Sequence, residues 1–155
     1  ALDLEGFCDV GIISYTAKFS SAYYGPFRTA LDSAPKVNNR KLIPDNKSTY
    51  QMDPANSKEA LIELALDQYE GADILMVKPG VSYLDIVYRL SNFSNKPIAA
   101  YNVSGEYSMV KAAAMKNWIN EKDIVLETLL SFKRAGAKLI LSYHSCDASK
   151  WLQEN

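Results

Sequence analysis

Four short apolar runs are spaced along the chain, and helix-like patterns separate them. Each run is only a few residues long and almost continuously apolar, which is typical of strands buried on both faces of a parallel sheet. The runs cover Val10–Ser14, Ile74–Val77, Ile98–Tyr101 and Leu139–Ser142. We therefore expect four strands of a parallel sheet.

Helical periodicity fills the intervals between these runs. The segment Ser57–Tyr69 carries leucines at helical spacing and stops before Gly71. A second helical pattern starts after Asn120, a residue type that caps helix N-termini, and continues to Gly136. Three further helices are expected, and they follow Tyr83, follow Glu106 and contain Trp151. Alternating strands and helices predict an α/β fold with right-handed crossovers.

Two architectures are compatible with four strand–helix units. One is a small doubly wound sheet, and the other is half of a (β/α)8 barrel, whose full form needs about 250 residues. The chain has neither a GxGxxG nor a GxxxxGK[ST] phosphate loop, which weakens the doubly wound, nucleotide-binding alternative. A long polar segment over about 20–51 follows the first predicted strand, and its length predicts an active-site lid.

The composition is that of an ordinary globular domain. The 155 residues are 48% hydrophobic and 23% charged, with a net charge of -1, which fits one domain with its own core. Balanced charge gives no electrostatic footprint for nucleic acid, and no apolar run approaches the roughly 20 residues that a membrane span needs. Cys8 and Cys146 lie far apart, so no disulfide framework or CxxC metal motif is visible. We expect no nucleic acid and no membrane among the partners.

Two consecutive strands of the predicted sheet lead to a lysine. Lys18 follows the first apolar run, and Lys78 follows the second. Sites in parallel α/β folds form at the carboxyl ends of the strands, so we expect both amines to face one cavity. A neutral amine attacks a ketone to form a Schiff base. Its ordinary pKa of about 10.4 falls through apolar burial and through a nearby like charge. The alternative is that each lysine extends from its strand end into solvent.

Other polar side chains near the strand ends and in the predicted lid are candidate anion ligands. Arg28 and Arg40 have guanidinium groups that suit a carboxylate, although arginines of a polar loop are ordinarily solvated. Ser104 and Tyr143 offer hydroxyl donors, and a packing aromatic is an equal alternative for Tyr143. His144 has the chemistry of a proton shuttle or ligand, but a lone histidine beside a strand end is more often structural.

Six motifs occur in order along nearly the whole chain. They are SYTAKFSSAYYGPFR, STYQMDPAN, EGADILMVKPG, YLDIV, AAYNVSGEYSM and FKRAGAKLILSYH. Together they strongly resemble the 5-aminolevulinate dehydratases, also called porphobilinogen synthases, from about Gly6 to Trp151. The resemblance covers the C-terminal half of that family's barrel. It implies that residues 1–155 form the last four βα units of a single TIM-barrel catalytic domain, a (β/α)8 barrel, with the lid at about 20–51.

The same resemblance implies an activity and roles for particular residues. The family's enzymes are lyases (hydro-lyases) of tetrapyrrole biosynthesis, the route to haem and chlorophyll, that condense two 5-aminolevulinate molecules to porphobilinogen through lysine Schiff bases. By this resemblance Lys78 binds the first substrate and Lys18 the second. The implied substrate-binding residues are Arg28, Arg40 and Gln51 for the second substrate, and Ser104, Tyr143 and Tyr101 for the first.

Cofactor, assembly and location are implied by the resemblance alone. It implies a divalent metal, magnesium or zinc, with active-site ligands outside this chain, and a homo-oligomer, an octamer in this family. Glu63 matches an allosteric magnesium ligand of some members, although a lone helical glutamate is usually a solvated charge. The implied location is the cytoplasm or a plastid. The chain departs from the family pattern in the lid, where Leu42–Ser48 is inserted.

Two alternative functions stay open, and one expectation concerns stability. Another Schiff-base barrel enzyme, such as a class I aldolase, would need one lysine and phosphate donors rather than two lysines and two carboxylate sites. A non-catalytic half-barrel would serve as an interaction or assembly module.

We also expect the isolated half-barrel to be unstable and inactive, because its sheet edges and barrel interior would be exposed.

Overall fold

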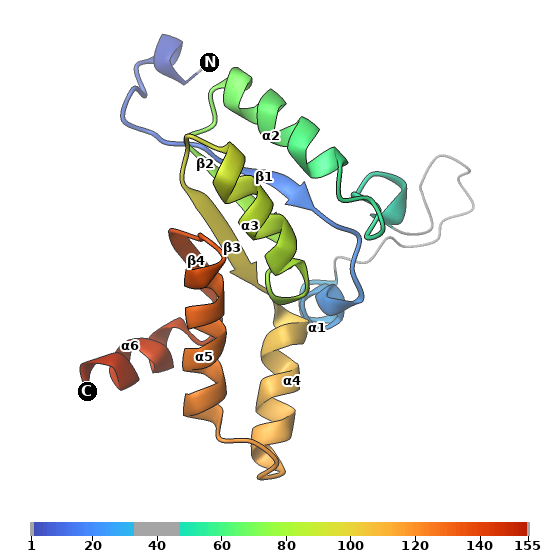
Figure 1. Cartoon of the computed structure of the whole chain (residues 1–155), viewed down its shortest axis with the longest axis vertical. Helices are drawn as coiled ribbons and strands as arrows, with labels where there is room; N and C mark the ends of the chain where they lie inside the picture. The colour runs from blue at the N-terminus through green and yellow to red at the C-terminus, as the bar shows by residue number, and fades with distance from the viewer. Residues whose placement is uncertain (1, 33–46, 155) are drawn as a thin grey trace.

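The computed structural model describes residues 2–32 and 47–154. Arg40 and residues 42–46 of the lid insertion lie outside the described residues. Four parallel strands form one sheet in the order β1-β2-β3-β4 (Figure 1). The strands are β1 (Ile13–Lys18), β2 (Ile74–Lys78), β3 (Ile98–Asn102) and β4 (Leu139–Ser142).

Helices follow the strands as the alternating pattern predicts. The α-helices are α1 (Gly25–Ala30), α2 (Glu59–Glu70), α3 (Leu84–Phe93), α4 (Ser104–Met115), α5 (Glu121–Arg134) and α6 (Ser145–Gln153). Short 3-10 turns occur at η1 (Asp3–Glu5), η2 (Ala22–Tyr24), η3 (Lys47–Thr49) and η4 (Val81–Tyr83). The side chain of Asn120 caps α5 by accepting from the N–H of Asp123, as predicted. In the described part of the chain, every helix is too short or too polar to cross a bilayer.

The first strand lies further along the chain than its apolar run predicts. The prediction was Val10–Ser14, whereas β1 spans Ile13–Lys18. Val10 is 52% exposed, and the buried residues of β1 are Thr16 and Ala17. Because β1 is an outer strand of the described sheet, burial does not determine its limits. Its hydrogen-bonded pairing with β2 does. The helix predicted to follow Glu106 likewise begins two residues earlier, at Ser104.

The core lies where the sheet meets the helices packed on one of its faces. Leu75 and Val77 of β2, Leu90 of α3 and Phe132 of α5 have no exposed surface. Burying a side chain of this size contributes about 1.5–3 kcal/mol. In Figure 1, α2 and α3 lie in front of β1 to β3, so one side of the sheet is well covered.

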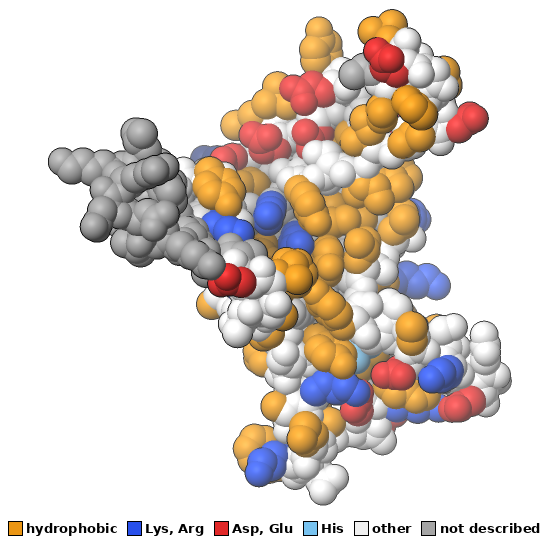
Figure 2. Space-filling view, turned by 180° about the vertical axis from the view of Figure 1, so that it is seen from behind, with side chains coloured by type: hydrophobic (Ala, Val, Ile, Leu, Met, Phe, Trp, Pro, Cys, Tyr) orange, Lys and Arg blue, Asp and Glu red, His pale blue; other side chains and the backbone are white. Residues whose placement is uncertain are grey.

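The opposite side of the sheet is much less covered. Tyr15 in β1 and Leu139 in β4 are exposed, as is Tyr143 directly after β4. Figure 2 shows hydrophobic side chains gathered on this side, with Lys and Arg side chains among them. The described chain therefore leaves apolar surface on the face of its sheet that would line a barrel.

A close approach between two backbone segments fixes how the end of β3 meets the chain after β1. A Cβ on Gly105, the second residue of α4, would lie 2.4 Å from the carbonyl oxygen of Tyr23 and 2.7 Å from its Cα. Backbone atoms cannot rotate away as a flexible side chain can. Gly105 therefore lets η2 pack directly on the first turn of α4.

Gly105→Ala should lower the free energy of unfolding of the complete protein by about 1–3 kcal/mol, because it overpacks this contact. Gly25→Ala is the matched control, since a Cβ there meets nothing within 4 Å and its φ of -49° is helical. The control should change stability by less than about 0.5 kcal/mol. Denaturant unfolding followed by circular dichroism measures both variants, and equal effects would contradict the role given to Gly105.

Candidate active site

The two predicted lysines end adjacent strands. Lys18 and Lys78 are opposite each other in the β1–β2 ladder, and the pairing continues as the N–H of Phe19 donates to the carbonyl oxygen of Lys78 at 3.0 Å. Lys18 Nζ lies 5.3 Å and Lys78 Nζ 4.8 Å from the centroid of the Tyr15 ring. The two amines are therefore on one side of the sheet, closer together than the sum of these distances.

Aromatic rings surround the amine of Lys78. Its Nζ lies 4.1 Å from the ring centroid of Tyr101, 4.8 Å from that of Tyr15 and 5.8 Å from that of Tyr24. Burial, and then the positive charge of Lys18, lower the pKa of Lys78 from 10.5 to about 8. Roughly a tenth of this amine is neutral at pH 7. This neutral fraction is the form that attacks a ketone.

Lys18 has a more cationic environment. Burial lowers its pKa, and the positive charges of Lys47 and Arg28 lower it further. Arg28 comes from α1 and lies over the ring of Tyr24, with its guanidinium carbon 5.4 Å from the ring centroid. The structure therefore places one of the predicted lid arginines at the lysine pair, and it adds Lys47 as a further cation.

The predicted lid is fixed to the strand ends through its described residues. The N–H of Phe27 in α1 donates to Ser104 Oγ at 3.1 Å. The hydroxyl of Tyr24 lies 3.0 Å from the carbonyl oxygens of both Phe19 and Lys78, and its single O–H is shared between these two acceptors. These bonds connect the segment after β1 to the ends of β2 and β3. They hold η2 and α1 over the site.

Lys78 shares a small hollow with three of the predicted ligands. Ser104, Tyr143 and Tyr101 line it with Lys78, and the remaining lining residues are Tyr24, Phe27 and Val103. Burial, and then a hydrogen bond with Tyr143, raise the pKa of Tyr101 to about 12, so its phenol stays protonated at neutral pH. The hollow combines one amine with several hydroxyl groups, which can bind a ketone and an anionic group of the same molecule.

Lys18 faces a second hollow, which Gln51 and Glu63 also line. Gln51 reaches it because the N–H of Met52 donates to the carbonyl oxygen of Lys18 at 3.1 Å, which extends the sheet edge. Gln51 Oε1 is buried and has no hydrogen-bond partner among the described residues. An uncompensated buried acceptor is unfavourable, and the described residues supply no donor to this oxygen. Each lysine thus lines its own hollow with part of the predicted set, whereas Arg28 lines neither hollow.

The described residues do not fit a metal site. Across 2–32 and 47–154, no three His, Cys, Asp or Glu side chains are arranged to hold a metal ion. Burial raises the pKa of Glu63, and the charges of Asp67, Glu59 and Glu70 raise it further. A single carboxylate in a hollow that also contains Lys18 is not a magnesium site by itself. Magnesium binding by Glu63 stays a prediction.

His144 lies outside both lysine hollows. It is 3% exposed, and its ring packs on Tyr107 with centroids 4.5 Å apart. Neither ring nitrogen has a hydrogen-bond partner among the described residues, and burial lowers its pKa. His144 lines a separate hollow with Met109, Val110 and Val125. This location favours the structural alternative over a proton shuttle at the lysines.

Two tyrosines of the site are not among the predicted substrate-binding residues. Tyr15 lies beside both amines, and Tyr24 contacts Lys78 and Arg28. Strict strand alternation would put residues 15 and 18 on opposite faces. The β1–β2 register shifts between Ser14 and Ala17, and this irregularity returns Tyr15 and Lys18 to one face. The signal available in the sequence was the aromatic pair at 23–24 in the predicted lid.

Known proteins resemble this chain in sequence. The family model for delta-aminolevulinic acid dehydratase matches residues 1–151. The chain is 59% identical over 154 residues to the delta-aminolevulinic acid dehydratase of Synechocystis sp. and 58% identical over 154 residues to that of Bacillus subtilis. It is 61% identical over 153 residues to the chloroplastic protein of Chlamydomonas reinhardtii. These matches cover 98–99% of this chain but 39–45% of the relatives, so the chain spans less than half of their length.

A solved structure resembles the chain as well. It is the delta-aminolevulinic acid dehydratase of Toxoplasma gondii in complex with the reaction product porphobilinogen. The match has a TM-score of 0.91 at 52% identity, and it covers 99% of this chain and 42% of the other. The four parallel strands are therefore arranged as in part of that TIM-barrel protein, which confirms the predicted fold class.

The lowered pKa of Lys78 is directly measurable in the complete protein. Acetylation by acetic anhydride, followed by mass spectrometry across pH, should give a midpoint near 8 for Lys78. Lys18→Met should raise the midpoint because a like charge is lost, but it should stay below 10.5 because burial is the larger cause. Lys138→Met, at the opposite end of the sheet, should leave the midpoint unchanged. A wild-type midpoint near 10.5, or no response to Lys18→Met, would contradict this electrostatic account.

Proposed function

The chain belongs to the delta-aminolevulinic acid dehydratase family, and we propose that residues 1–155 supply the Schiff-base half of a porphobilinogen synthase barrel. One observation carries the proposal. Two lysines with lowered pKa values lie side by side at adjacent strand ends, each facing its own hollow. Two amines match a reaction that joins two ketone substrates, whereas an aldolase-like enzyme needs only one.

The first substrate is assigned to the hollow of Lys78. The neutral amine attacks the ketone carbon of 5-aminolevulinate, and the resulting carbinolamine loses the ketone oxygen as water to give the Schiff base. The hydroxyl groups of Ser104 and Tyr143 hold the carboxylate, and Tyr101 packs beside the imine. The contact of Lys78 with three rings keeps bulk water away from the bond that forms.

The second substrate is assigned to the hollow of Lys18. Its carboxylate is held by Arg28, Gln51 and Arg40, the last of which lies outside the described residues. Lys18 forms the second Schiff base, again with loss of the ketone oxygen as water, so that both substrates are held covalently. The carbon–carbon and carbon–nitrogen bonds then form at the two imine carbons, and each lysine is released as a free amine. Fixing two reactants in this way can lower the activation free energy of the condensation by about 7–11 kcal/mol.

The remaining properties are proposed at the level that the relatives support. Enzymes of this family are in general metalloenzymes, and the described residues select neither magnesium nor zinc. The partners are the small-molecule substrate and further copies of the chain in a homo-oligomer. Relatives include bacterial and chloroplastic proteins, which supports the cytoplasm or a plastid. The lid comprises about 20–51, of which 20–32 and 47–51 are described.

Borohydride reduction in the presence of 5-aminolevulinate tests the mechanism in the complete protein. Mass spectrometry should find reduced adducts on Lys78 and Lys18. Lys78→Met should lower porphobilinogen formation by more than about 10³-fold, because the nucleophile is lost. Lys138→Met should have no effect.

The same experiment separates the alternatives. An aldolase-like enzyme would keep its activity in Lys18→Met, whereas the synthase should lose porphobilinogen formation. A non-catalytic module would show adducts on neither lysine, and that result would defeat the proposal.

A further inference from the structure

Glu106 is a buried carboxylate that the proposed reaction does not use. It lies in the first turn of α4 and is 6% exposed. Its Oε1 accepts from the N–H of Val81 at 2.8 Å. Its Oε2 accepts from the N–H of Val103 at 2.8 Å and from Asn102 Nδ2 at 3.2 Å. A buried carboxylate is costly without donors of this kind, so these segments are fixed together around it.

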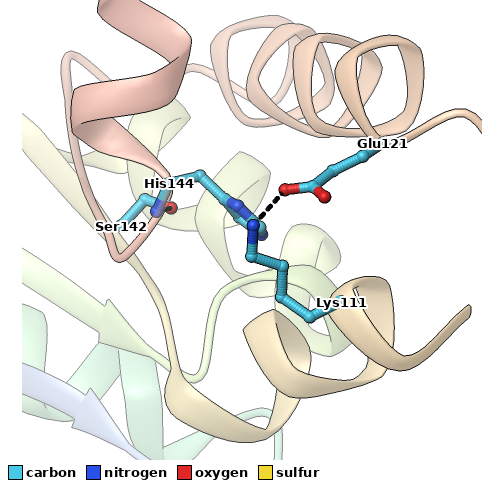
Figure 3. A network of polar contacts seen from close by, with 4 residues as sticks. All are labelled: Lys111, Glu121, Ser142 and His144. Carbon is cyan, nitrogen blue, oxygen red and sulfur yellow. Dashed lines mark hydrogen bonds and ion pairs between the residues drawn. The ribbon is translucent and has the colours of Figure 1, made fainter. Parts of the chain in front are cut away.

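The hydrogen bonds continue from Glu106 to the end of β4. Asn102 Oδ1 accepts from Ser142 Oγ at 3.0 Å, and Ser142 Oγ accepts from the N–H of His144 at 3.1 Å. Figure 3 shows Ser142 and His144 together where β4 passes into α6. One chain of hydrogen bonds therefore runs from Val81, after β2, through Glu106 of α4 and Asn102 of β3, to His144.

Each strand end in this chain of bonds carries one residue of the Lys78 hollow. Lys78 precedes Val81 by three residues, Ser104 directly follows Val103, and Tyr143 lies between Ser142 and His144. None of the bonds engages the Lys78 amine or the phenol of Tyr143. Glu106 thus holds the backbone under the amine and under both hydroxyl groups while touching none of them.

The geometry points to Glu106 as a positioning residue that sets the spacing between the Lys78 amine and the hydroxyl groups of Ser104 and Tyr143. That spacing makes the hollow prefer a ketone with a carboxylate over a neutral ketone of the same length. A ligand's own bonds fix the distance from its carbonyl carbon to its carboxylate, so the amine and the hydroxyl groups must match that distance together. This inference rests on the proposed function of Lys78.

The test compares two ketones of equal length, one of which ends in a carboxylate and the other in a neutral amide. Borohydride capture on Lys78 of the complete protein is followed by mass spectrometry with levulinate and with its neutral amide, levulinamide. The wild type should capture levulinate faster. Glu106→Gln replaces one acceptor oxygen by a donor NH2 group that faces another donor. It should lower the levulinate-to-levulinamide ratio by about ten- to a hundredfold, the cost of a misplacement of about 1 Å.

A matched control removes a different polar contact of the same helix. Glu121 of α5 pairs with Lys111 of α4, outside the chain of bonds (Figure 3). Glu121→Gln should leave the ratio unchanged. Ser142→Ala cuts the chain at its far end without introducing a buried charge or donor, and it should lower the ratio by a smaller factor. If Glu106→Gln does not fold, Ser142→Ala decides.

The remaining outcomes would contradict either the inference or the proposed function. An equal loss of capture for both ketones in the folded variants would overturn the inference, because lower amine reactivity affects both ketones alike, whereas a changed spacing alters their ratio. An unchanged ratio, or a wild type without preference, would also overturn the inference. A wild type that captures neither ketone on Lys78 would instead overturn the proposed function.

Discussion

Parallel pairing between β1 and β2 places two ammonium groups at the same end and on the same side of one sheet. The ladder sets Lys18 opposite Lys78, so the two residues cannot separate along the backbone without breaking its hydrogen bonds. Like charges at such a separation repel, and burial removes the water that would screen them. The arrangement therefore favours loss of a proton from the more buried amine, which is Lys78.

The aromatic rings around Lys78 weaken the tendency of its ammonium group to lose a proton. A cation over a ring face gains about 0.5–2 kcal/mol, so the rings near Lys78 partly compensate its ammonium form for lost hydration. Burial and the charge of Lys18 act in the opposite direction and lower the pKa of Lys78 to about 8. The phenols themselves stay protonated, since burial raises the pKa values of both Tyr24 and Tyr101. Apart from Lys18, the neighbours of Lys78 are thus uncharged, and both its neutral amine and its ammonium form are accessible near neutral pH.

Local sequence patterns predicted the parts of the fold that local burial determines. The runs that became β2, β3 and β4 are buried or half-buried along nearly all of their length, and their predicted limits agree with the structure to within one residue. The run at Val10 is exposed, so hydrophobicity misplaced β1.

Proximity of the two lysines followed from parallel topology, but Tyr15 joined them only through a register irregularity that no periodicity encodes. Gln51 reached Lys18 through a long-range backbone pairing. Roles of individual residues came from the family motifs, because spacing alone cannot distinguish a carboxylate ligand from a packing tyrosine.

The environments of the two amines differ, and the difference suits a reaction between two identical molecules that must be used differently. Lys78 lies among neutral rings and hydroxyl groups, in a hollow held together by backbone hydrogen bonds to Tyr24 and Glu106. Lys18 lies near the cations Lys47 and Arg28, and its hollow includes residues of the segment after the lid. The neutral rings and hydroxyl groups around Lys78 bind a substrate by shape and hydrogen bonds. The cations near Lys18 attract an anion over a longer range, although Glu59 and Glu63 also line that hollow. The two hollows therefore differ, before any substrate is bound, in the way that the proposed reaction requires.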